Sequence, residues 1–133
     1  MLFYECLLVG LGGFVGSILR YLMGFISINE STSFPVNTFL INIMGALLIS
    51  LIAFYITNYN VHNINPSTLK SLILFLKVGV CGGFTTFSTF ALETGDLIRS
   101  GNVTIAFTYV LLSVLVGVSV IFLPDLIYHY HVN

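Results

Sequence analysis

The sequence predicts an all-α membrane protein with four transmembrane helices. Of its 133 residues 57% are hydrophobic and only 7% are charged, with a mean hydropathy of +1.05, whereas soluble domains carry roughly 25% charged residues. Four apolar runs are each long enough for the ~20 residues that cross a bilayer as a helix. The runs are continuous, without the alternation of β-barrel strands. We expect one domain over 1–133, with helices at about 2–27, 36–57, 68–99 and 103–128, the first being retained.

Composition also excludes several function classes. The net charge is −1, so no basic patch points to nucleic acid or anionic lipid as a partner. Cys6 and Cys81 lie inside predicted helices without metal-type spacing, which argues against a disulfide framework or a zinc site. Four short helices enclose little interior, and we therefore expect an oligomer.

The few cations are divided almost equally between the two sides of the membrane. Lys70 and Lys77 fall on one side, and Arg20 and Arg99 on or towards the other. Lys and Arg in short loops set orientation, so the sequence barely specifies which way up the chain inserts. Either this balance is chance in a small protein, or the chain inserts both ways and pairs with an inverted copy.

The first span carries a Gly12-xxx-Gly16 spacing, which favours close packing of helix backbones. Arg20 in the same span is costly in lipid and usually marks a water-filled cavity or an anion's route. In the second span, expected to open after Pro35, Thr38 and Asn42 are four apart and share a face. Asn42 is predicted to clasp another helix or to face something polar that passes by.

The third span contains the stretch VCGGFTTFSTF, which interrupts it. About 32 residues would give a helix of ~48 Å, too long for the bilayer unless it is strongly tilted. The adjacent Gly82 and Gly83 predict a break at 82–85. Exposed backbone at such a break needs an ion, water or protein to satisfy it, so the sequence predicts either an ion near the midplane or a simple glycine kink. Ser67 or Thr68 is expected to cap the start of this span.

Aromatic and charged residues follow the break. Phe84, Phe87 and Phe90 recur in steps of three, a spacing typical of core packing, although the electropositive ring edge could also face a small anion. Glu93 and Asp96 with Arg99 suggest an interfacial ion-pair cluster, with a role at a pore mouth as the alternative for Glu93.

The last span also combines a polar stripe with interfacial residues. Tyr109, Ser113 and Gly117 form a narrow stripe on one face. The residues 128–131, YHYH, are interpreted as an interfacial aromatic belt.

The chain resembles the Fluc (CrcB) family of small microbial fluoride channels over essentially its whole length. GGFTTFSTF, with the LE that follows, is the most specific part, supported by GGFVGSILRY, PVNTFLINIMGALL and YVLLSVLVG. The resemblance implies an antiparallel, dual-topology homodimer of two inverted copies around two fluoride pathways. It also implies a structural Na⁺ at the dimer centre, held by the backbone carbonyls of Gly82 and Thr85 from each copy.

The resemblance further implies roles for individual side chains. Phe87 and Phe90 would line the pore, and Arg20 would supply positive potential to a vestibule. The remaining residues implied on the fluoride pathway are Asn42, Ser113, Tyr109, Ser88, Thr89 and Thr38. The chain departs from the usual family pattern at Asn37, Leu47, Ser50 and Gly117, outside the central motif.

The expected function is passive export of cytoplasmic fluoride through a multi-pass protein of the bacterial cell membrane, which lowers fluoride toxicity without enzyme activity. One alternative is a proton-coupled fluoride transporter that uses Glu93 or Asp96 as the proton carrier. Another is one subunit of an obligate heterodimer with a homologous chain.

Overall fold

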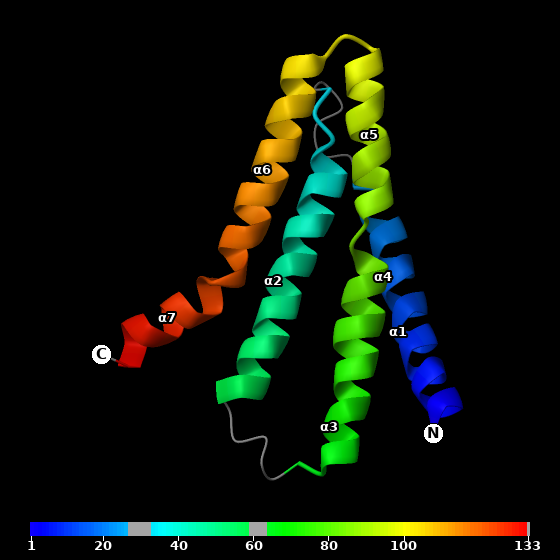
Figure 1. Ribbon diagram of the computed structural model, residues 1–133, viewed down its shortest axis with the longest axis vertical. Coiled ribbons are helices and arrows are strands. Elements are labelled where there is room, and N and C mark those ends of the chain that lie inside the picture. Colours follow the sequence, from blue (N-terminus) through cyan, green and yellow to red (C-terminus); the bar gives the residue numbers. More distant parts are fainter. Residues whose placement is uncertain (27–32, 59–63, 133) are drawn as a thin grey trace.

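The computed structural model describes residues 1–26, 33–58 and 64–132, which form an elongated bundle of helices lying side by side (Figure 1). The third span consists of four consecutive pieces, and a separate short helix follows the last span. The elements are α1 (Leu2–Met23), α2 (Val36–Asn58), α3 (Pro66–Leu72), the π-helix η2 (Ile73–Cys81), α4 (Gly82–Phe84), α5 (Phe87–Arg99), α6 (Val103–Ile121) and α7 (Leu123–Val132).

Four membrane-competent helices are present in the described part of the chain, which confirms the predicted fold class. By length and composition they are Leu2–Met23, Val36–Asn58, Pro66–Arg99 and Val103–Ile121. The fourth differs from the expected 103–128, because it ends at Ile121 and a separate helix follows. The cap of the third span also differs from expectation, since it is the side chain of Asn65 that accepts a hydrogen bond from the Ser67 amide at 3.1 Å.

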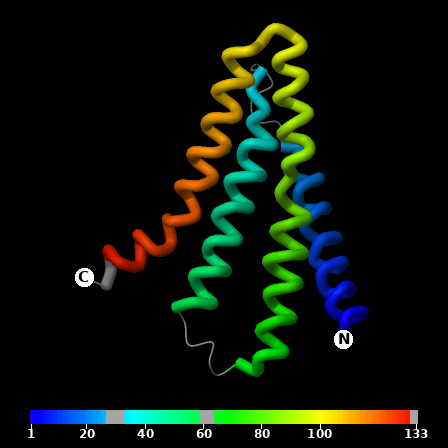
Figure 2. Tube along the Cα trace, viewed as in Figure 1, coloured from blue at the N-terminus to red at the C-terminus, as the bar shows by residue number. Residues whose placement is uncertain are grey.

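The third span is interrupted, as predicted, but not at its glycines. Gly82 has helical angles (φ −65°, ψ −37°), and the extended residues are Thr85 (φ −76°, ψ 157°) and Thr86 (φ −147°, ψ 109°). The predicted break at Gly82-Gly83 is therefore corrected to Thr85–Thr86, seen as a bend in the trace of Figure 2. A Cβ at Gly83 would collide with the backbone of Gly13, so Gly83 serves close helix approach rather than the break.

Glycines allow α1 to lie directly against the third span, as the Gly12-xxx-Gly16 spacing predicted. Both glycines are buried. A Cβ at Gly12 would overlap the carbonyl oxygen of Phe75, and one at Gly16 the carbonyl oxygen of Val80. In a bilayer such small-residue contacts hold helices together by van der Waals packing, so this pair of helices forms the closest packing in the described chain.

A tight turn brings α5 back against α6. The Asn102 amide donates to the Leu97 carbonyl at 2.8 Å and the Gly101 amide to the Ile98 carbonyl at 3.1 Å, the paired bonds of a Schellman motif. Gly101 has φ 81°, a conformation that is strained for residues with a Cβ. The turn places Leu97 beside α6, where it forms the buried core with Ala106 and Tyr109.

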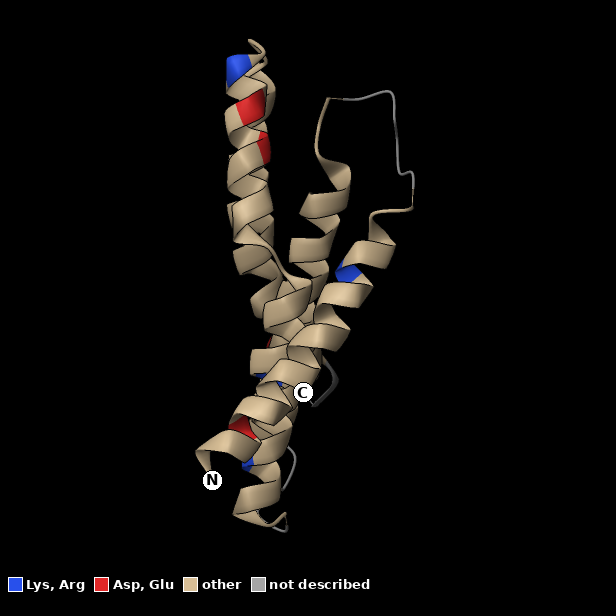
Figure 3. Cartoon of the chain, turned by 90° about the vertical axis from the view of Figure 1, so that its right-hand side faces the viewer, with Lys and Arg blue, Asp and Glu red and all other residues tan. Residues whose placement is uncertain are grey.

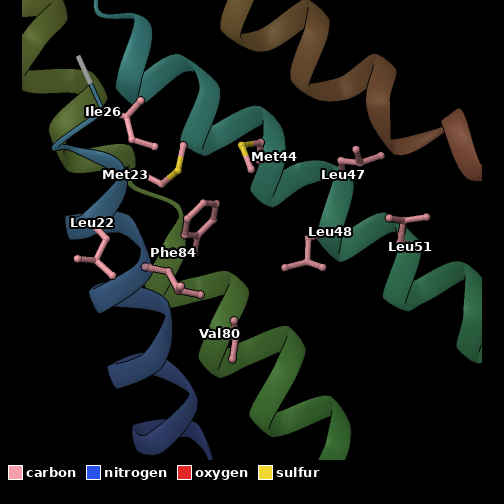
Figure 4. Close-up of a pocket in the computed structure, with 10 residues that line it drawn as sticks. Leu22, Met23, Ile26, Met44, Leu47, Leu48, Leu51, Val80 and Phe84 are labelled. Carbon is pink, nitrogen blue, oxygen red and sulfur yellow. The ribbon is translucent and has the colours of Figure 1, made fainter. Parts of the chain in front are cut away.

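Little of the remaining apolar surface is covered within one chain. Along α1, for example, Leu11, Phe14 and Ile18 are exposed. Figure 4 shows side chains of α1, α2 and the third span around a hollow of about 490 Å³ with an almost wholly apolar lining. Lipid or another protein must cover such a surface.

Charged residues occur towards both ends of the long axis (Figure 3). Lys70 pairs with Glu5 at 2.6 Å, and Arg99 pairs with Asp96 at 2.8 Å. The second pair confirms part of the ion-pair cluster predicted after the break.

Candidate functional site

The centre of the site is a two-way clasp between α2 and the interruption of the third span. The Thr86 amide donates to Asn42 Oδ1 at 2.8 Å, and Asn42 Nδ2 donates to the Thr86 carbonyl at 3.2 Å. The Asn42 amide thus satisfies both backbone groups of an extended residue at membrane depth, where water is absent. Of the two predicted roles for Asn42, the interhelical clasp is the one observed, and it leaves one of the two Nδ2 hydrogens for another acceptor.

The same interruption releases backbone carbonyl groups, those of Gly82 and Thr85 among them. In a continuous α-helix the Thr86 amide would donate to the Gly82 carbonyl, and the Thr89 amide to the Thr85 carbonyl. Here the Thr86 amide donates to Asn42, and the Thr89 amide donates to Thr86 Oγ1 at 3.2 Å. The carbonyls of Gly82 and Thr85 therefore lack the donors that a continuous helix would supply.

Thr86 also starts the second half of the third span. Its hydroxyl is the N-cap acceptor for the Thr89 amide, an arrangement that typically stabilises a helix by about 1 kcal/mol. The same hydroxyl donates to Thr89 Oγ1 at 2.9 Å and lies 3.4 Å from Ser88 Oγ. The hydroxyls of Ser88 and Thr89 are thus gathered around a buried Thr86.

Glu93 lies inside the bundle and not in the interfacial cluster predicted for it. The Thr38 hydroxyl donates to Glu93 Oε1, and the Tyr109 hydroxyl donates to Glu93 Oε2, both at 2.8 Å. Arg99 pairs instead with Asp96, because Asp96 is one turn from Arg99 whereas Glu93 faces α2 and α6. The carboxylate thereby joins three helices, and Thr38 and Tyr109, both predicted pathway residues, meet at it.

The phenylalanines after the break form a stack that leads to Tyr109. The ring centroids of Phe87 and Phe90 are 5.8 Å apart, and those of Phe90 and Tyr109 are 5.0 Å apart. Phe34 closes the stack with an edge contact to Tyr109 at 5.2 Å. Phe87 is 79% exposed whereas Tyr109 is fully buried, so the aromatic series runs from the outer surface of one chain to its core.

Arg20 and Glu93 line one polar cavity of about 440 Å³. Its other lining residues are Ser17, Tyr21, Gly24, Asn37, Thr38, Ile41, Thr86 and Thr89. Arg20 is half-buried and forms no ion pair with Glu93 among the described residues. An unpaired cation at this depth keeps its positive potential directed into the cavity, where it attracts anions.

Ser113 belongs to α6, and its hydroxyl is buried. It lies one turn beyond Tyr109, on the same helix face. Within the described part of the chain, its Oγ is the one buried side-chain polar atom without a hydrogen-bond partner. A buried hydroxyl without a partner carries a desolvation cost of about 1–3 kcal/mol, so its position calls for a ligand, water or a second chain.

Sequence reasoning did not predict the positions of two residues in this site. Thr86 was not singled out, and Glu93 was assigned chiefly to the interface. Their separation of seven residues, two helical turns, places them on one face of α5 with Phe90 between them. That spacing could have indicated that Glu93 lies on the same side of the third span as Thr86.

The chain is a small multi-pass helical protein. Its broken third span, its cavity lined by Arg20 and Glu93 and its orphaned buried hydroxyl are features that ion-conducting membrane proteins also show. Comparison with known proteins specifies the family. Residues 7–124 match the family model described as CrcB-like protein, Camphor Resistance (CrcB), and the chain belongs to this family, as its resemblance predicted.

Curated relatives cover most of the chain. It is 42% identical over 113 residues to a Phocaeicola vulgatus protein (84% of this chain, 88% of the relative) and 44% identical over 111 residues to one from Flavobacterium psychrophilum (82% and 84%). It is 39% identical over 122 residues to a Chlorobaculum tepidum protein (92% of each). Each of the three is named "Fluoride-specific ion channel FluC".

Proposed function

We propose that this chain is a fluoride-selective channel of the bacterial cell membrane, which lets cytoplasmic fluoride leave down its electrochemical gradient. Family membership and the names of bacterial relatives support fluoride as the ion. The observation that carries a pathway through this chain is the buried, unpartnered hydroxyl of Ser113 beside the aromatic and hydroxyl series of α5 and α6.

The proposed route uses weak donors in place of the hydration shell. Ring edges of Phe87 and Phe90 are electropositive, the second Nδ2 hydrogen of Asn42 is free of the clasp, and Ser113 adds a hydroxyl. Such donors can replace fluoride's water and still release the ion, which conduction requires. The hydroxyls of Ser88 and Thr89 and the Tyr109 ring complete the proposed lining.

Arg20 is proposed to concentrate fluoride at the entrance. Its cavity also contains Glu93, but both carboxylate oxygens already accept hydrogen bonds, from Thr38 and Tyr109. This neutralises part of the negative potential, so the uncompensated Arg20 charge prevails at the mouth.

We further propose that two inverted copies form the channel around a structural Na⁺. The released carbonyls of Gly82 and Thr85 suit a hard cation, which prefers oxygen ligands, and two copies would offer four of them. Two features support pairing. One is the apolar hollow of Figure 4, whose lining side chains from α1, α2 and the third span are not covered by the described part of the chain. The other is the equal division of Lys and Arg, which fits insertion in both orientations. A homologous second chain in place of an identical copy is the alternative assembly.

The decisive experiment measures fluoride and chloride efflux from liposomes containing only this chain. We expect rapid fluoride efflux, little chloride efflux and no strict dependence on a proton gradient. A strict proton requirement would favour the coupled-transport alternative, and no efflux would favour an obligate heterodimer.

Variants test the proposed route in the same assay. Phe87→Ile, Phe90→Ile and Asn42→Asp should each strongly reduce fluoride efflux, because they remove a ring edge or place a negative charge beside the path. Phe107→Ile, at an exposed position on α6, is the matched control and should behave as the parent. Unchanged efflux in all three pathway variants would reject the route.

A further inference from the structure

The chain ends in a helix that does not continue the fourth span. At 1.5 Å per residue, the 19 residues of α6 already cover about 28 Å, close to the ~30 Å hydrocarbon thickness. The direction then changes at Phe122, and α7 leads sideways from the lower end of α6 (Figure 1). With 10 residues, or about 15 Å, α7 is too short to cross a bilayer.

The sequence of α7 gives it an apolar face, which the structure leaves uncovered. At about 100° per residue, side chains at i, i+3, i+4 and i+7 share one face, and these are Leu123, Leu126, Ile127 and Tyr130. Leu126 is 64% exposed and Ile127 is 52% exposed. This face continues the apolar outer surface of α6, where Leu115 and Val118 are exposed as well.

The other two faces of α7 differ in character. Pro124 is buried, and the Tyr128 ring makes an edge contact with Phe54 of α2, with centroids 5.4 Å apart. Asp125 and His129 are exposed and four apart, on the remaining face. The helix therefore presents one side to protein, one apolar side and one charged or polar side, separated by roughly a third of a turn each.

The contact with α2 fixes the level of α7 relative to the membrane. Phe54 lies one turn before the end of α2, and Thr57 and Asn58 after it are exposed polar residues. A polar helix end marks the boundary between hydrocarbon and water. α7 thus lies at this boundary.

We infer that α7 is an interfacial helix that binds the lipid surface, with Leu126 and Ile127 among the acyl chains and with Asp125 and His129 in the aqueous headgroup layer. Its three faces match the three neighbours that a helix lying flat beside a membrane protein meets. The exposed polar face beside the apolar one and the level of α7 at the polar end of α2 favour the lipid surface as the occupant over a second copy of the chain. The inference does not depend on which ion is conducted.

Site-specific fluorescence quenching in liposomes tests this placement. On a Cys6→Ser, Cys81→Ala background, single cysteines are introduced as Leu126→Cys and His129→Cys and labelled with a polarity-sensitive dye. Leu115→Cys on α6 and Asn58→Cys at the end of α2 serve as lipid and water references. Far-UV circular dichroism and gel filtration of each variant, compared with the background, report whether the fold is intact, and Ile127→Cys replaces Leu126→Cys if that variant does not fold.

The quenchers are a nitroxide carried shallowly on phospholipid and aqueous iodide. For a side chain buried about 5–10 Å into the headgroup boundary, the ratio of lipid to iodide quenching at position 126 should exceed that at 129 by about tenfold. Equal iodide quenching at both positions would put α7 in water and overturn the inference. Protection of position 126 from both quenchers would mean that protein, such as a second copy, covers this face, and would overturn it equally.

Discussion

Replacing Tyr109 with phenylalanine isolates the contact that joins α6 to Glu93. The variant removes the hydroxyl that donates to Glu93 Oε2 at 2.8 Å and leaves the ring in place. Contacts of the ring with Phe90 at 5.0 Å and with Phe34 at 5.2 Å are retained. Tyr109 is fully buried, so the substitution leaves the exposed surface of the chain unchanged.

The expected loss of stability follows from the kind of hydrogen bond. A bond to a charged acceptor is worth about 1.5–3 kcal/mol in soluble proteins, and interhelical bonds in membranes average about 0.6 kcal/mol with a maximum near 1.7. Because this carboxylate is partly buried where three helices meet, we expect Tyr109→Phe to lower the free energy of unfolding by about 1–2 kcal/mol. Thr38→Val removes the donor to Oε1, and the double variant should lose more than the sum, since it leaves the carboxylate without either donor.

Unfolding titrations in mixed detergent micelles measure the loss of stability. Fluoride efflux from liposomes measures the effect on conduction. Efflux should fall in Tyr109→Phe, because a less compensated carboxylate repels the anion in the cavity that it shares with Arg20. Each 1.4 kcal/mol added to the barrier slows passage by about tenfold. Tyr4→Phe, which removes an exposed hydroxyl, is the control.

Two results would refute this reasoning. Equal stability of Tyr109→Phe and Tyr4→Phe would show that the Glu93 contact contributes nothing to the fold. Unchanged efflux despite lost stability would separate Glu93 from the anion's path.

Two other substitutions test packing and the orphaned hydroxyl. Gly16→Ala should destabilise the chain by about 1–3 kcal/mol, because its Cβ would overlap the Val80 carbonyl oxygen. Gly10→Ala on the same helix, where nothing lies within 4 Å, is the control and should be neutral or stabilising. Equal unfolding free energies of the two variants would show that α1 does not depend on this close approach. Ser113→Ala should raise stability by up to about 1–3 kcal/mol, because it removes a buried hydroxyl that bonds to no described group, while it slows fluoride efflux. A loss of stability would instead reveal a protein partner for Ser113.

The sequence predicted the parts of the fold that depend on local patterns. The four spans follow from hydropathy alone. The close approach at Gly12 and Gly16 follows from their spacing, because residues one helix turn apart lie on the same face. The break was predicted at 82–85, and the structure has it at Thr85 and Thr86, so the two overlap only at Thr85. Glycine permits both a kink and close packing. Only the contact of Gly83 with Gly13 of α1 shows that Gly83 serves close packing.

Contacts between distant segments were harder to predict. The partner of Asn42 is the backbone of Thr86, 44 residues away, and no local pattern selects between a clasp and a passing ion. The end of the fourth span was misplaced because the apolar residues of α6 and α7 continue in one run, and only the change of direction at Phe122 separates a crossing helix from a flat one. The inverted dimer and its Na⁺ stay predictions.

The π-helix η2 makes the third span sensitive to its residue count. In a π-helix each amide donates five residues back instead of four, so Ile73–Cys81 absorbs chain length that an α-helix could not. If the same nine residues relaxed to α-helix, everything after them would rotate about the axis, because an α-helix advances about 100° per residue and the wider π-helix advances less. Thr86 would then turn away from Asn42 although neither residue had changed. The alignment of the two halves of the span is therefore set by the number of residues in η2 as much as by their identity.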